Sequence, residues 1–138
     1  MRKSAILSLC FLIMLLLSMG CGEKAGEYEL GQEFTLPIKN EAVIKGENLR
    51  IEFTEVTADS RCPRNVQCVW AGEASYILKV SQGDDSELVA ITEPAAEDPV
   101  TTVWHGYKIL TSLEPYPQDP GDIDAGDYRL RMSVRKNA

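Results

Sequence analysis

Apolar and polar residues alternate along most of this chain, and this period of two limits its fold more than any other feature. The alternation is clearest over residues 49–54, 107–110 and 128–135. Successive side chains of a strand point to opposite faces, so such a segment buries one face and exposes the other. No stretch shows convincing helical periodicity. The pattern therefore predicts an all-β fold.

Turn-forming Gly, Pro, Asp and Asn residues divide the chain into about seven predicted strands. These segments are 33–37, 42–45, 49–56, 74–81, 87–92, 100–113 and 128–135. Strands of this number and length favour an antiparallel β-sandwich of immunoglobulin-like type, with a small β-barrel as the alternative.

A short pattern near the C-terminus favours the sandwich. Asp124, Gly126 and Tyr128 have the spacing found before a late strand of immunoglobulin-like domains, where the tyrosine hydroxyl binds the backbone at a corner. Leu130 stands where antibody-type domains place their second cysteine. The sequence thus predicts the architecture without an inter-sheet disulfide.

The N-terminus resembles a bacterial lipoprotein signal. Arg2 and Lys3 precede an apolar run over 5–17, and Gly20 comes directly before Cys21. Such signals are cleaved at a small residue, and the cysteine then carries the lipid. Ser18 departs from the usual branched aliphatic residue, so ordinary secretion or an uncleaved anchor stays open as an alternative.

This interpretation divides the chain into three parts. Residues 1–20 are the predicted signal peptide, 21–32 the lipidated N-terminus and tether, and 33–138 the β-sandwich domain. The predicted location is extracytoplasmic, with the lipid on Cys21 as the contact with the membrane.

The four cysteines fit this division. Cys10 lies in the predicted signal and Cys21 would carry the lipid, which leaves Cys62 and Cys68 in the domain. Outside the cytoplasm such a pair is expected to form a disulfide. Redox catalysis is disfavoured, because catalytic pairs usually lie two residues apart at a helix N-terminus.

The cysteines belong to the densest motif of the chain, which covers 59–72 and reads DSRCPRNVQCVWAG. It resembles the Asp-Ser-Arg-Cys-Pro-x-x-Val-x-Cys-Val-Trp-Ala-Gly motif of a family of small, uncharacterised bacterial lipoproteins and secreted proteins, and it matches every fixed position. The resemblance implies a fold and an extracytoplasmic location, but no activity.

Two roles are open for this loop: a structural corner, or a presented binding loop. Trp70 is expected to pack inside the sandwich with Val66 and Val69, and Gly72 to let the chain turn into the next strand. The candidate binding residues are Arg61, Pro63, Arg64 and Asn65. A partner is expected to touch the two arginines.

Charge disfavours nucleic acid as a partner. Removing residues 1–20 takes Arg2 and Lys3 from 14 basic residues and none of the 21 acidic ones, so the formal charge falls from −7 to −9. Phosphate contacts need clustered Lys and Arg. The basic residues of the last strand alternate with apolar ones and are interpreted as a solvated face; they are Arg129, Arg131, Arg135 and Lys136.

Metal and hydrolytic chemistry have little support. His105 is the only histidine, so a multi-histidine zinc site is excluded. No metal site or cofactor is predicted. The acidic run 119–127 departs from the EF-hand order and is interpreted as a turn. Its weak calcium candidates are Asp119, Asp122, Asp124 and Asp127.

The sequence therefore predicts a non-enzymatic, lipid-anchored binding or interaction module with an envelope protein as its partner. A protease inhibitor that presents the disulfide-braced loop is the first alternative. An enzyme of unknown chemistry, dependent on His105, is the second. The ligand and the oligomeric state are not predicted.

Overall fold

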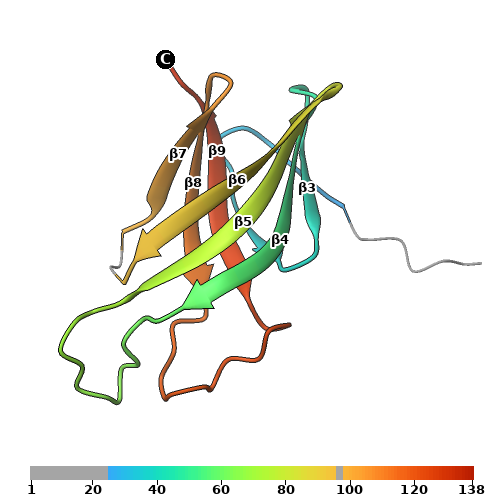
Figure 1. The fold of residues 1–138 in the computed structure, drawn as a ribbon. Helices are drawn as coiled ribbons and strands as arrows, with labels where there is room; N and C mark the ends of the chain where they lie inside the picture. Colours follow the sequence, from blue (N-terminus) through green and yellow to red (C-terminus); the bar gives the residue numbers. More distant parts are fainter. Residues whose placement is uncertain (1–24, 96–97) are drawn as a thin grey trace, which may run out of the picture.

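The computed structural model describes residues 25–95 and 98–138. The regular secondary structure of these residues consists of β-strands alone (Figure 1). The strands form two sheets. The first has the order β1-β3-β4-β5-β6 and comprises β1 (Gly26–Tyr28), β3 (Glu41–Ile44), β4 (Leu49–Asp59), β5 (Glu73–Gln82) and β6 (Asp85–Pro94). The second has the order β2-β9-β8-β7 and comprises β2 (Glu33–Pro37), β7 (Val100–Trp104), β8 (Tyr107–Glu114) and β9 (Arg129–Lys136).

The all-β prediction is confirmed, and the described strands form two open sheets instead of a closed barrel. The predicted signal peptide and Cys21 lie outside the described residues. Within the described ranges there is no helix long and apolar enough to cross a membrane.

The prediction of about seven strands missed two of the nine described ones. The segment 100–113 is two strands, because His105 and Gly106 form a tight turn with φ angles of 43° and 84°. Trp104 and Tyr107 pair across that turn. The second addition is β1, which lies in the segment interpreted as a tether and pairs parallel with β3, unlike the antiparallel pairs elsewhere.

The apolar faces of the two sheets meet in one core. The alternation seen in the sequence explains it, because Leu49, Ile51 and Phe53 of β4 are fully buried, while Arg50 between them is exposed. Leu130 and Val134 of β9 are equally buried from the other sheet. The core is thus built by the period-two pattern, as expected from the sequence.

The end of β4 brings the chain to the candidate site. Two bulges interrupt its pairing with β5, and after them Asp59 lies opposite the buried Ala74. The chain then enters a loop over 60–72, here named the disulfide loop. A second loop, over 115–128 and named the proline loop, joins β8 to β9. Both extend from the same end of the molecule (Figure 1).

Candidate functional site

The disulfide loop is closed by the predicted bond between Cys62 and Cys68, whose Cα atoms lie 6.0 Å apart. The ends of the loop are also joined, since the amide of Cys62 donates a hydrogen bond of 2.8 Å to the carbonyl of Ala71. The disulfide prediction is confirmed. Oxidised cysteines agree with a location outside the cytoplasm.

Backbone hydrogen bonds fasten the disulfide loop to the proline loop. The amide of Arg64 donates to the carbonyl of Pro117 at 3.1 Å, and the amide of Asn65 donates to the carbonyl of Gln118 at 2.9 Å. Because backbone groups make these bonds, they fix the position of the loop itself. Pro63, another predicted binding residue, is half-buried and directly precedes Arg64 and Asn65.

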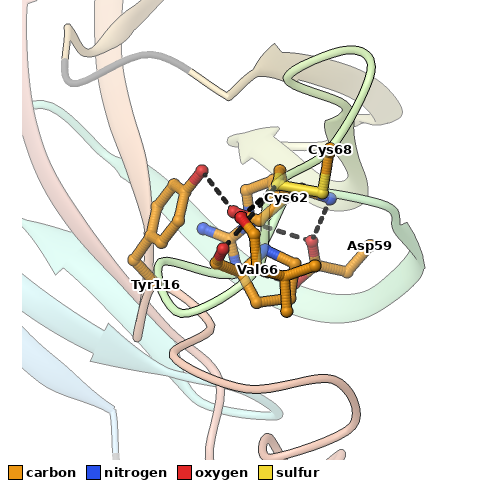
Figure 2. The surroundings of a disulfide bond; sticks show 7 residues. Asp59, Cys62, Val66, Cys68 and Tyr116 are labelled. Carbon is orange, nitrogen blue, oxygen red and sulfur yellow. Dashed lines mark hydrogen bonds and ion pairs between the residues drawn. A yellow bond between two sulfur atoms is a disulfide. The ribbon is translucent and has the colours of Figure 1, made fainter.

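Side chains add further links between the loops. The hydroxyl of Tyr116 donates to the carbonyl of Cys62 at 3.0 Å, and Figure 2 shows the ring reaching toward that carbonyl. The amide nitrogen of Asn65 donates to Oδ1 of Asp119 at 3.2 Å. A loop held by a disulfide and by several hydrogen bonds to its neighbour loses little conformational entropy when it binds a partner.

Arg61 contradicts the prediction that it is a partner contact, because it is buried, with 1% of its side chain exposed. Its Nε and Nη2 donate to the two carboxylate oxygens of Asp59 at 2.8 and 2.6 Å. Its Nη1 donates to the carbonyl of Leu113 at 2.8 Å, and Nη2 also donates to the carbonyl of Pro115 at 3.0 Å. The planar guanidinium thus ties β4 to the end of β8.

The position where β7 begins explains why a charged side chain is needed inside the domain. The pairing of β7 with β8 stops at Val100 opposite Thr111, so Leu113 lies beyond the last partner. Its amide donates to both carboxylate oxygens of Glu93 at 3.1 and 2.9 Å, while its carbonyl accepts from Arg61. Buried backbone groups must be paired. Two charged side chains therefore replace the missing strand at Leu113.

Glu93 extends this arrangement into the core. The hydroxyl of Tyr76 donates to Glu93 at 3.1 Å and shares a second hydrogen bond of 2.7 Å with the hydroxyl of Thr111. We name the connected set the polar clasp; its members are Asp59, Arg61, Tyr76, Glu93, Thr111 and Tyr128. Among the described residues, no buried side-chain nitrogen or oxygen lacks a hydrogen-bond partner. The clasp is thus a fully satisfied network.

The two carboxylates of the clasp have pKa values shifted in opposite directions. Burial by itself would raise the pKa of Asp59, but the hydrogen bonds and charge of Arg61 outweigh it and leave the pKa lowered. Burial raises the pKa of Glu93, and the hydrogen bonds from Leu113 and Tyr76 offset only part of that rise. The same ion pair leaves the pKa of Arg61 raised despite its burial.

Tyr128 does not make the corner contact predicted from its motif. Its hydroxyl donates to Oδ2 of Asp59 at 3.1 Å, a side chain of the other sheet, rather than to nearby backbone. Burial and the adjacent carboxylate raise its pKa to about 12. The other two residues of the motif lie in a turn, where the amide of Asp127 binds the carbonyl of Asp124 and Gly126 is exposed. The tyrosine therefore joins the sheets through the clasp.

Trp70 contradicts the predicted burial. Its side chain is 62% exposed, and Val69 and Val66 are exposed by 104% and 40%. The buried position near the start of the loop is occupied by Arg61 of the clasp, and the second half of the loop lies at the surface. We name this exposed set the apolar tip; it consists of Val66, Val69 and Trp70.

Gly72 returns the chain from the apolar tip to β5. Its φ angle is 79°, a region that other residues rarely adopt, and a Cβ atom there would overlap the carbonyl oxygen of Ser60. Ser60 is held in place because its hydroxyl donates to the carbonyl of Glu73 at 3.0 Å. The position tolerates only glycine.

The acidic run acts as turn structure. Oδ2 of Asp122 accepts from the amides of Gln118 and Asp119, and these bonds close a turn. Over residues 25–95 and 98–138, no group of three metal-ligating side chains is assembled.

His105 is exposed at the turn between β7 and β8. Its ring stacks on Trp104, and its Nδ1 lies 3.5 Å from a carboxylate oxygen of Asp85. It lies in neither of the two loops that form the candidate site.

Comparisons with protein-family models, with curated proteins and with solved structures gave no match. The candidate site therefore depends on the geometry of this chain alone. No sequence motif indicated Glu93, Tyr76 or Thr111 as members of the clasp. Glu93 carried a weak signal, because it shares the inward face of β6 with Ile91 and breaks the polar–apolar alternation there.

Proposed function

We propose that this chain is a lipid-anchored, extracytoplasmic, non-enzymatic binding module that presents the apolar tip to an envelope protein. The observation that carries the proposal is the exposure of Trp70 and Val69 on a loop braced by a disulfide. Exposed aromatic residues on a rigid support are typical of binding hot spots. The membrane anchor would be a lipid on Cys21, and an immunoglobulin-like β-sandwich is the proposed architecture, supported by the two facing sheets.

The brace supports binding rather than simple loop closure. Burying an aromatic side chain of this size removes about 150 to 250 Å² from solvent and stabilises a fold. An exposed tryptophan does not contribute that stabilisation, so a loop that only connects strands gains nothing from it. The disulfide and the hydrogen bond from Cys62 to Ala71 close the loop on both sides of Val69 and Trp70, and the links at residues 61–65 attach its first half to the proline loop. Little ordering entropy then opposes association.

Crosslinking to envelope proteins in cells that produce the full chain tests this proposal. A partner is expected to crosslink to the unaltered chain and to an Arg50→Gln variant, which changes an exposed residue of β4. A Val69→Ser, Trp70→Ser variant should lose the same partner. Equal recovery of that partner with all three chains would contradict the proposal.

Membrane fractionation tests the anchor separately. Cys21→Ala should release the domain from the membrane or leave the precursor unprocessed by the lipoprotein pathway. Unchanged retention with the N-terminal segment still attached would indicate a transmembrane anchor instead.

Protease inhibition is the second candidate, and the observation that favours it is Arg64. This arginine is exposed on the braced loop, whereas Arg61 is buried and cannot enter a protease cleft. Inhibition of trypsin by the full chain, lost in Arg64→Gln with the fold retained, would select this function. Cleavage of the loop without inhibition would exclude it.

A further inference from the structure

A groove of about 510 Å³ opens beside the polar clasp, where the two loops meet the end of the second sheet. Four of its lining residues are arginines from two parts of the chain: the disulfide loop supplies Arg61 and Arg64, and β9 supplies Arg129 and Arg131. We name it the arginine groove. Its other lining residues include the carboxylates Glu93 and Glu114, with Tyr116 and Gln118. Arg61 is buried and paired with Asp59, so Arg64, Arg129 and Arg131 supply the exposed positive charge of the groove.

The arginines of β9 share one carboxylate between them. Glu114 lies 3.4 Å from Nε of Arg129 through one oxygen and 3.5 Å from Nε of Arg131 through the other. The two arginine side chains remain 47% and 44% exposed. Among the side-chain hydrogen bonds of the described residues, none uses the terminal nitrogens of either guanidinium. Each therefore has donors to offer to a second carboxylate.

Arg64 has an aromatic support in place of an acidic partner. Its guanidinium lies 4.8 Å from the centre of the Tyr116 ring. The position of that ring is fixed because its hydroxyl donates a hydrogen bond to the carbonyl of Cys62. No salt bridge to Arg64 is found within the described ranges. Stacking on an aromatic orients the guanidinium and leaves its edge free for hydrogen bonds.

The positive charge continues along β9 beyond the arginine groove. A second hollow of about 220 Å³ is lined by Arg131 and Arg135, so Arg131 belongs to both. The side chains of Arg129, Arg131 and Arg135 share the outer face of the strand, and alternate residues of a strand are about 6.6 Å apart. An extended peptide repeats its own side chains at the same distance. The surface therefore offers a track matched to an extended chain.

We propose that the arginine groove binds an acidic, extended peptide segment of a partner protein. The groove combines arginines with the acceptors Glu114 and Gln118, and a peptide meets both needs because it carries carboxylates and N–H donors. A phosphate polymer offers only acceptors, so the acceptor Glu114 in the groove disfavours it. The site is separate from the apolar tip and does not rest on it.

Fluorescence anisotropy with the full chain in neutral detergent tests the proposal. The probe is a fluorescein-labelled peptide of alternating Glu and Val, compared with its Gln and Val counterpart and with labelled polyphosphate. The Glu peptide should bind, and raising the salt concentration should weaken binding because exposed charges are screened. We expect Arg129→Gln combined with Arg131→Gln to weaken it roughly tenfold, as loss of charge-assisted hydrogen bonds predicts.

Three further variants make the result specific. Arg64→Gln, on a different element, should also weaken binding, and it keeps the test valid if the β9 variant fails to fold. Arg50→Gln on the other sheet and Trp70→Ser at the apolar tip should leave the affinity unchanged. The proposal is overturned if the Glu peptide does not bind, if the Gln peptide binds equally well, if polyphosphate binds in its place, or if Arg64→Gln and the β9 variant retain full affinity.

Discussion

The two halves of the disulfide loop motif are placed in opposite ways. At its start, the charged Arg61 is buried between the sheets and paired with Asp59. At its end, Val69 and Trp70 face water. By hydrophobicity alone the order would be reversed.

This contrast shows that backbone pairing can decide which side chain is buried. Leu113 lies beyond Val100, the first residue of β7, and its buried amide and carbonyl need partners that an apolar side chain cannot supply. Arg61 and Glu93 provide them. The inner face is then filled, and the aromatic of the same motif is left for the surface. The first half of the motif contributes Asp59 and Arg61 to the polar clasp, and the second half contributes Val69 and Trp70 to the apolar tip.

The largest effect should come from the buried half of the motif. Arg61→Ala removes the partner of Asp59 and leaves the carbonyls of Leu113 and Pro115 without their hydrogen bonds, so we expect a loss of about 3 to 5 kcal/mol in the free energy of unfolding. Chemical denaturation measures it. Arg64→Ala, the matched control from the exposed side, should change stability by no more than about 0.5 kcal/mol. Equal losses of unfolding free energy for the two substitutions would contradict the distinction between a buried, stabilising half of the motif and an exposed half.

The disulfide that joins the halves should contribute less than the clasp. Replacing Cys62 and Cys68 together with Ser removes a short covalent loop, and the chain-entropy relation gives a loss of about 2 to 2.5 kcal/mol. The domain should still fold, because the core of the two sheets remains. Denaturation of the double variant, beside unaltered chain with and without reductant, checks this. A variant that no longer folds would show that the loop organises the core.

The pH dependence of stability should come from the carboxylates of the polar clasp and not from the apolar tip. The pKa of Asp59 is lowered on folding, so its contribution is complete above its ordinary value of 3.8 and is lost as the pH falls through the lower folded value. Asp59→Asn should flatten this acid limb of a stability–pH curve. The pKa of Glu93 is raised, so stability should decline as the pH rises from the ordinary value of 4.5 through the folded value. Glu93→Gln should remove that decline, and curves unchanged by both variants would contradict the assignment.

The smallest effect on stability is expected at the apolar tip. Trp70→Ala should change the free energy of unfolding by no more than about 0.5 kcal/mol, because the side chain is largely exposed. The fluorescence lost with Trp70 should be red-shifted relative to the signal that remains from the buried Trp104. Trp104→Ala is the control and should cost about 3 to 5 kcal/mol. A loss of that size at Trp70 would place its indole inside the domain.

Local pattern determined much of the fold from the sequence alone. The alternation over 49–54 and 128–135 gives the strands and the buried residues, because a strand's side-chain period is fixed at two by its backbone. The pair Cys62 and Cys68 is equally local, since six positions separate the two. The split of 100–113 was missed because His105, rather than a glycine, begins the turn with a positive φ angle.

Tertiary structure alone decided the burial of Arg61 and the exposure of Trp70. The carbonyl that requires Arg61 belongs to Leu113, 52 positions away, and it needs a partner because β7 begins only at Val100, opposite Thr111. The arginine groove likewise combines the disulfide loop with β9, which are brought together by the packing of the two sheets. A sequence pattern records which side chains prefer water, whereas unpaired backbone groups exist only once the strands have been assembled.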